Sequence, residues 1–189
     1  MLKRHRFISG LSMCILILFI GITSVTQFDK GSDPWLEDNL TFMTEEVDLE
    51  LENYLKDLSI MLVDASDDIW SNHSSVGYIQ KMTQMAETAD LVIALDYGHG
   101  LFEGSVLEAL GKLQTFLALN VQVNSANHGY NFHTKHRGFD YLALDERELR
   151  LASQSRRKTV MELAKEVLGG SPPMQLSITL GGDGSLFFD

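Results

Sequence analysis

The chain has little cysteine and few basic residues for its length. Cys14 is the only cysteine among 189 residues, which excludes an intramolecular disulfide and a metal cluster held by thiolates. The sequence contains 15 basic and 26 acidic residues, and three of the basic residues precede the first acid. The part after Gln27 therefore has a net charge of −14. Such a surface repels nucleic acid and anionic lipid, so we expect neither as a partner of the folded part.

The sequence also lacks internal repeats and low-complexity tracts, so no repeat architecture is expected. With 189 residues, of which 44% are hydrophobic, the chain is long enough to bury one sizeable core. Three regions differ in composition: an apolar segment at 1–27, an acidic linker and helix at 28–75, and a regular α/β pattern at 76–189.

The apolar segment contains Phe7–Val25, 19 residues without a charge that follow three basic residues. This pattern is typical of a secretory signal or a short membrane anchor. No clean small-residue cleavage site follows it, so we favour an uncleaved anchor. A non-native start, from a disrupted reading frame, is the other interpretation that we keep open.

The acidic region carries 13 acids between Asp29 and Asp68, against two lysines. Residues 28–42 have the composition of a linker. Apolar positions between Thr44 and Leu58 fall roughly on one helical face, which predicts a helix there. We interpret the acids as a solvated face rather than as a cation site.

From Val76 onward, helical patterns alternate with short apolar runs. The expected helices are 76–88, 104–113, 146–152 and 158–168, and the expected strands are 91–95, 115–123, 140–144 and 174–180, followed by a turn at 181–184 and an apolar run at 185–188. This alternation predicts an α/β fold, a parallel-rich sheet flanked by helices, with right-handed crossovers. Because the sequence stops directly after a strand-like run, we expect the domain to be incomplete.

The apolar run at 91–95 predicts a strand buried on both faces. Asp96 follows at its carboxyl end, where open α/β sheets place their ligands. Gly98 and Gly100 permit a sharp turn or a close approach to a bound group. The alternative is a strand-to-helix turn in which Asp96 caps the next helix.

The loop after the second of these strands carries five side-chain amides: Asn120, Gln122, Asn124, Asn127 and Asn131. An amide offers a donor and an acceptor without charge, which suits sugar hydroxyls. The alternative is a turn that uses asparagine for its tolerance of left-handed backbone angles.

Carboxylates open the helix after the third strand, at Asp145, Glu146 and Glu148. Hard oxygen ligands at the carboxyl edge of a sheet suit Mg²⁺. Acids are also common there because the helix dipole favours them. A further metal site could use His99, His128, His133 and His136, but we favour solvated histidines because no cysteine is nearby and the context is a loop.

Four motifs in order resemble the ribokinase-like (PfkB) carbohydrate kinases, most closely the sugar-kinase domain of ADP-heptose synthase-type kinase/nucleotidyltransferases. They are Asp-Tyr-Gly-His-Gly at 96–100, Asn-Val-Gln-Val-Asn-Ser-Ala-Asn at 120–127, Phe-Asp-Tyr at 139–141 leading into Asp145-x-x-Glu148, and Ile-Thr-Leu-Gly-Gly-Asp-Gly-Ser-Leu at 178–186. The resemblance covers just over half of the chain.

The resemblance assigns roles to several positions. It implies that Glu148 helps to hold Mg²⁺ near the phosphates, with Asp145 standing where the family has asparagine. It places Thr179, Gly181 and Gly184 beside the ATP, and Asp96, Gly100 and the amides of 120–127 in loops on the substrate side.

Other family features are missing from these residues. The Asp-Pro-Lys of relatives is replaced by Asn120-Val121-Gln122, which removes a phosphate-contacting lysine, and the Gly-Ala-Gly-Asp that carries the catalytic aspartate is absent. The resemblance therefore implies a fragment of a carbohydrate kinase, inactive alone, with nucleotide and a sugar or sugar phosphate as partners and the cytoplasm as its location. It leaves a homodimer open. The alternative is a non-catalytic α/β module that binds a polar ligand and is anchored to a membrane through residues 7–25.

Overall fold

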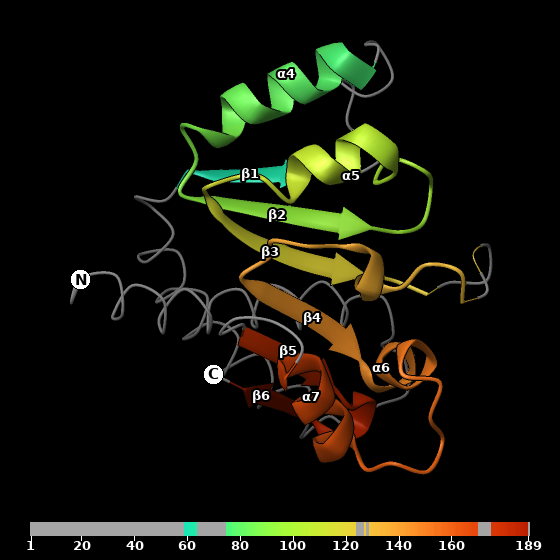
Figure 1. Ribbon diagram of the computed structural model, residues 1–189. Coiled ribbons are helices and arrows are strands. Elements are labelled where there is room, and N and C mark those ends of the chain that lie inside the picture. Colours follow the sequence, from blue (N-terminus) through green and yellow to red (C-terminus); the bar gives the residue numbers. More distant parts are fainter. Residues whose placement is uncertain (1–58, 64–74, 124–126, 128, 170–174, 189) are drawn as a thin grey trace, which may run out of the picture. The chain divides into compact units, whose positions relative to one another are not determined.

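Six strands form one sheet in the described part of the chain, which comprises residues 59–63, 75–123, 127, 129–169 and 175–188 of the computed structural model (Figure 1). The strands lie in the order β1-β2-β3-β4-β5-β6. Their bounds are β1 Ile60–Val63, β2 Leu91–Asp96, β3 Phe116–Val121, β4 Tyr141–Asp145, β5 Gln175–Thr179 and β6 Ser185–Phe188. The first five are parallel, and β6 returns antiparallel to β5.

Four α-helices lie between these strands in the described ranges. Their bounds are α4 Ser75–Ala86, α5 Gly104–Leu110, α6 Glu146–Ala152 and α7 Val160–Gly169, and two short 3₁₀ turns are η1 His133–Lys135 and η2 Gly181–Asp183. Every helix and strand predicted from residue 76 onward is present, with ends that differ by a few residues. The predicted α/β class, with a largely parallel sheet flanked by helices, is therefore confirmed.

Strand β1 was not predicted. It pairs with β2 through Ile60 and Leu91 and lies within residues 28–75, which the sequence pattern assigned to a linker and a helix. The sheet thus begins before residue 76. Four residues are too few to show a strand period by themselves, and their pairing with β2 spans about thirty residues of sequence.

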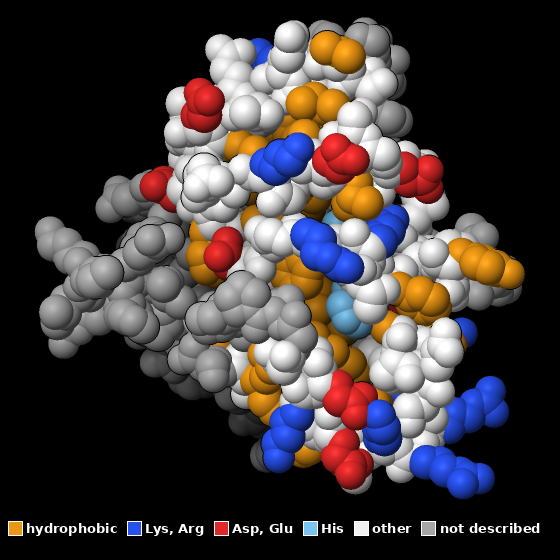
Figure 2. All heavy atoms as spheres, viewed as in Figure 1, with side chains coloured by type: hydrophobic (Ala, Val, Ile, Leu, Met, Phe, Trp, Pro, Cys, Tyr) orange, Lys and Arg blue, Asp and Glu red, His pale blue; other side chains and the backbone are white. Residues whose placement is uncertain are grey.

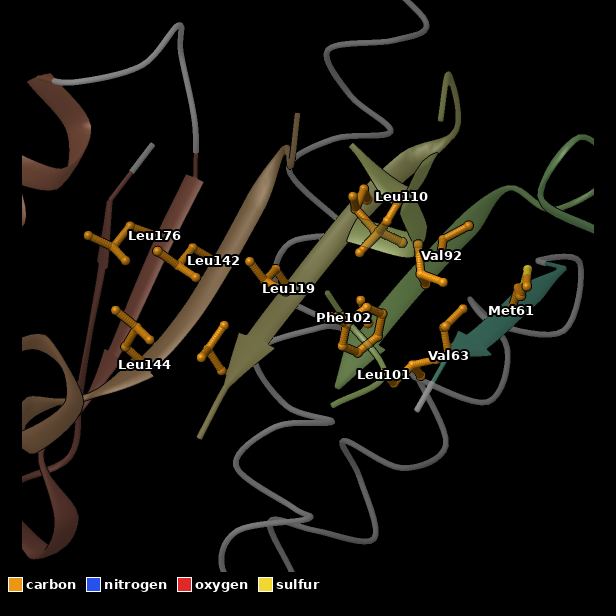
Figure 3. Packing of buried hydrophobic residues seen from close by; sticks show 14 of the residues in the cluster. Met61, Val63, Val92, Leu101, Phe102, Leu110, Leu119, Leu142, Leu144 and Leu176 are labelled. Atoms are coloured by element: carbon orange, nitrogen blue, oxygen red, sulfur yellow. The ribbon is translucent and has the colours of Figure 1, made fainter. Parts of the chain in front are cut away.

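A large hydrophobic cluster lies on the face of the sheet where alternate strand residues meet the helices. Figure 3 shows this cluster, with Val92, Leu119, Leu142 and Leu176 from four strands and Leu110 from α5. Strand β2 is buried at all six of its residues, which confirms the prediction of a strand covered on both faces. Burial of this size is the main favourable contribution to folding.

The carboxyl ends of β2 to β5 meet at one edge because these strands are parallel. Asp96 and Asp145 end β2 and β4, Asn120 is the penultimate residue of β3, and Gly181 follows β5. These four positions therefore gather at the carboxyl edge of the sheet.

Two predictions concern the first 58 residues. The apolar segment Phe7–Val25 and the helix expected over Thr44–Leu58 both lie outside the described residues. Within the part of the chain that is described, none of the helices has both the length and the apolar character needed to cross a bilayer.

Candidate functional site

A cavity of about 620 Å³ lies at the carboxyl edge of the sheet, beside α6. Its walls come from the end of β4, from α6 and the residues that follow it, and from the end of β5. The lining residues are Asp145, Glu146, Arg147, Arg150, Leu151, Gln154, Ser155, Arg156, Thr179, Leu180 and Gly181. The volume is within the range of small-molecule sites, about 300–1,000 Å³.

The cavity contains three of the five residues that the resemblance assigned to nucleotide or metal. Asp145, Thr179 and Gly181 line it. Glu148 lies one helical turn after Asp145 and is buried. Gly184 closes the turn between β5 and β6 at a positive φ and does not line the cavity.

The cavity is also lined by three arginines, Arg147, Arg150 and Arg156, which the sequence pattern did not single out. Arg150 is engaged, because its Nε donates to Glu146 Oε1 at 2.7 Å and its guanidinium also donates to the Lys158 carbonyl oxygen. Arg147 and Arg156 are exposed, and neither forms an ion pair with another described residue. Figure 2 shows basic and acidic side chains side by side over α6 and α7, at the lower end of the view. Arg147 and Arg156 therefore leave the cavity with cations that can meet an anionic ligand.

Helix α6 begins with a capping box formed by Asp145 and Glu148. The Asp145 carboxylate accepts from the Glu148 N–H, and Glu148 Oε2 accepts from the Asp145 N–H at 2.8 Å. This reciprocal pair satisfies two N–H groups that the helix leaves without an internal partner. Glu148 Oε1 also accepts from the Val123 N–H at 3.0 Å, which ties the end of β3 to the start of α6.

The environment of Glu148 favours its protonated form. Burial raises the pKa of this carboxyl to about 7, and the nearby charge of Asp145 raises it as well. The two backbone hydrogen bonds act in the opposite direction and lower the pKa, but by less. Both carboxylate oxygens already accept a backbone N–H. Glu148 therefore supports Asp145 from behind. Asp145 and Glu146 are the carboxylates that line the cavity, and Glu146 is paired with Arg150.

A second cluster of charges surrounds Asp96 at the end of β2. Its Oδ2 lies 2.8 Å from Lys135 Nζ and 2.8 Å from His136 Nε2, and its Oδ1 accepts from the Gly98 N–H at 2.9 Å. Burial alone would raise the pKa of Asp96, but these hydrogen bonds outweigh it and lower the pKa to about 2. Asp96 does not cap the next helix, whose N-cap is Glu103, so that alternative is wrong.

His133 and His136 are buried rather than solvated, which corrects the sequence-based interpretation for these two. His136 is 2% exposed and its ring meets Phe102 edge-on, while His133 is 9% exposed. Burial lowers the pKa of His133 to about 4, and its Nδ1 has no hydrogen-bond partner among the described residues. His99 is exposed and stacks on Tyr97. No group of three or more metal-binding side chains occurs in the described ranges, and His128 falls outside them.

The amides of the loop after β3 bind backbone carbonyls. Asn127 donates to the Tyr97 and Gln122 carbonyl oxygens, and Asn131 donates to those of Asp96 and Gln122. Asn120 donates to the Ala143 carbonyl oxygen at 3.1 Å. These side chains shape the loop and hold it against the end of β2. None of these three asparagines has a positive φ, so the alternative of a turn built on left-handed asparagine does not describe them. Asn124 lies outside the described residues.

The turn after β2 depends on Gly98 for two reasons. Its φ is +75°, and a Cβ added there would lie 2.6 Å from Asn127 Nδ2. Gly100 also has a positive φ, of +89°, but a Cβ there would meet open space. The loops at the ends of β2 and β3 are thus interlocked at Gly98 and separate from the cavity beside α6.

Comparison of the sequence with models of known protein families and with curated proteins finds no match.

Proposed function

We propose that the chain binds a nucleoside triphosphate, ATP with Mg²⁺, in the cavity beside α6, and that this site is the nucleotide side of a PfkB-type carbohydrate kinase with a ribokinase-like fold. The observation that carries the proposal is the convergence of Asp145, Thr179 and Gly181 on one cavity of about 620 Å³. Asp145 lies 34 residues before Thr179 in the sequence, and the resemblance assigns all three residues to nucleotide or metal.

The position and charge of the cavity support the same reading. Open α/β sheets bind ligands outside the carboxyl ends of their strands, and the cavity lies at the ends of β4 and β5. Arg147 and Arg156 supply cations for phosphate oxygens, in place of the lysine that the chain lacks at 120–122. Leu151 and Leu180 add apolar wall for a base or a ribose.

The carboxylates at the start of α6 fit Mg²⁺ in one way. Mg²⁺ in such sites is held by one or two carboxylates, by water and by the substrate phosphates. Asp145 would hold the ion through the carboxylate oxygen that does not accept from Glu148. Glu148 would act behind it, because both of its oxygens already accept backbone N–H groups. When bound, the ion would neutralise charge on the phosphates.

The proposal covers nucleotide binding and excludes phosphoryl transfer by this chain. Transfer depends on positioning and charge stabilisation around the phosphates, and these residues contain no Gly-Ala-Gly-Asp sequence. A sugar or sugar phosphate is the acceptor that the resemblance implies, in a cytoplasmic setting where ATP is available. We expect a coupled assay over a panel of sugars and heptose phosphates to detect no turnover.

The test is a titration of Mg-ATP into the full chain by NMR. We expect a dissociation constant on the order of 1 mM, about 4 kcal/mol of binding free energy. Arg147→Ala and Arg156→Ala should each weaken binding by roughly tenfold, because each removes a charge-assisted contact to phosphate. Arg157→Ala is the matched control: Arg157 is an exposed neighbour of Arg156 outside the cavity wall, and its removal should leave the affinity unchanged.

Failure of Mg-ATP to bind at about 10 mM, roughly 2.7 kcal/mol, would contradict the proposal. An equal loss of affinity in all three arginine variants would also contradict it, since this would show a general effect of net charge rather than a site. Turnover by the chain would show that the motif it lacks is dispensable.

A further inference from the structure

Gln154 has a backbone conformation that is costly for its side chain. Among the described residues other than glycine, only Gln154 has a positive φ, of 52°. It follows Ser153, the C-cap of α6, and its N–H donates to the Leu151 carbonyl oxygen while the Ser155 N–H donates to that of Arg150. This is the helix ending in which glycine is the usual residue, because glycine has no Cβ to strain.

The strained residue lies in the wall of the cavity. Gln154 lines it together with Ser155 and Arg156, and its side chain is exposed. Its amide forms no hydrogen bond with any other described residue, so nothing in this part of the fold accounts for a glutamine there. Strained residues of this kind cluster at active and binding sites, and the inference runs from the observed outlier to a function.

The two ends of α6 contribute different kinds of side chain to the cavity wall. Arg147, Arg150, Leu151 and Gln154 follow one another on one side of α6, at helical spacing. Arg147 stands beside Asp145 at the start of the helix, and Gln154 follows its end, seven positions later, which is roughly 10 Å along the axis. Asp145, Glu146 and Arg147 lie at the start of α6, and at its other end the uncharged amide of Gln154 and the apolar side chain of Leu151 share the wall with Arg156.

We propose that Gln154 recognises the base of the nucleotide. Its side-chain amide offers a donor and an acceptor, which pair with the polar edge of a base, while Arg147 at the other end of α6 binds the phosphates. The inference rests on the proposed function and deepens it, because it assigns the orientation of the nucleotide and a residue for its specificity.

The test compares ATP with inorganic tripolyphosphate, which carries the phosphates without a base. Gln154→Gly in the full chain removes the amide and the backbone strain together. We expect its affinity for ATP to fall three- to tenfold, its affinity for tripolyphosphate to stay within twofold, and its Tm to rise by a few degrees. Arg147→Ala should weaken both ligands. Gln114→Gly is the matched control: it is exposed and outside the cavity wall, and should leave both affinities unchanged.

The outcomes separate the two proposals. If the wild type binds ATP and Gln154→Gly binds it equally well, Gln154 has no part in recognition and this inference is overturned while the proposed function stands. An equal loss for ATP and tripolyphosphate would overturn the base contact. If the wild type binds neither ligand, the proposed function fails, and this inference fails with it.

Discussion

Replacing Glu148 with glutamine should change how the stability of the protein depends on pH. The side chain is 7% exposed, and its two carboxylate oxygens accept backbone N–H groups at 3.0 and 2.8 Å. Burial, assisted by the charge of Asp145, raises its pKa from 4.5 to about 7. The folded protein thus binds this proton more tightly than the unfolded chain does.

The sign follows from that difference in proton binding. Because the folded-state pKa is the higher one, the contribution of the protonated Glu148 to stability is fully present below pH 4.5 and is lost as the pH rises through 7. A shift from 4.5 to about 7, at 1.36 kcal/mol per pH unit, corresponds to roughly 3 kcal/mol. Glutamine has no proton to lose. The free energy of unfolding of the wild type, minus that of Glu148→Gln, should therefore fall by roughly 3 kcal/mol between pH 4.5 and 8.

Urea unfolding at several pH values measures this difference directly. Glu146→Gln is the control, because it removes a carboxylate from the same helical turn. The Glu146 side chain is 40% exposed and is paired with Arg150. Stability curves for the wild type and Glu148→Gln that run parallel across this range would refute the reasoning. The same pH dependence of the free energy of unfolding in Glu148→Gln and Glu146→Gln would also refute it.

Two further predictions concern the loops at the ends of β2 and β3. The pKa of the buried His133 is lowered to about 4, so the free energy of unfolding of the wild type should fall by up to roughly 3 kcal/mol as the pH drops from 6.5 through 4. His133→Phe should remove this loss in urea unfolding. If the stability of His133→Phe falls with pH as much as that of the wild type, the prediction is wrong. Gly98→Ala should lower the Tm more than Gly100→Ala does. Both positions have a positive φ, but only at Gly98 would a Cβ lie 2.6 Å from Asn127 Nδ2. Equal decreases in Tm would show that the protein relieves this clash at no cost.

Most of the fold could be predicted from the sequence because its signals are local. The apolar run at Leu91–Leu95 and the helical spacing within 146–152 each identify an element over a few residues, and the alternation of such elements implies a parallel sheet. Strand β1 could not be predicted in this way. Its four residues become a strand through pairing with Leu91–Ala94, a partner distant in the chain.

The candidate site could be predicted only in part, for a related reason. Asp145, Thr179 and Gly181 follow apolar strands, so their place at the carboxyl edge is implied by the pattern. The sequence does not distinguish Arg147 and Arg156 from other exposed arginines. Whether an exposed arginine lines a cavity depends on which elements pack next to it, and this is decided by the tertiary fold. No residue pattern distinguishes Gln154 either, since its backbone angle is visible only in three dimensions.

The burial of the histidines has the same origin. Asp96 and His136 are 40 residues apart and meet because the connection after β3 folds back over the end of β2. In the sequence, His133 and His136 stand in a polar loop, and loops are mostly exposed. The contacts of His136 with Asp96 and Phe102, and the hydrogen bonds from Asn127 and Asn131 to the backbone at the end of β2, are tertiary contacts that no local pattern encodes.

The central claim is that the cavity beside α6 binds nucleotide, and the most direct measurement is a map of the backbone amide shifts of the full chain during titration with Mg-ATP. The account predicts saturable shifts concentrated at residues 145–156 and 179–181, with a dissociation constant on the order of 1 mM. Shifts concentrated at residues 96–100 and 127–136 would contradict it, because they would place the ligand in the loops around Asp96. The absence of saturable shifts would contradict nucleotide binding altogether.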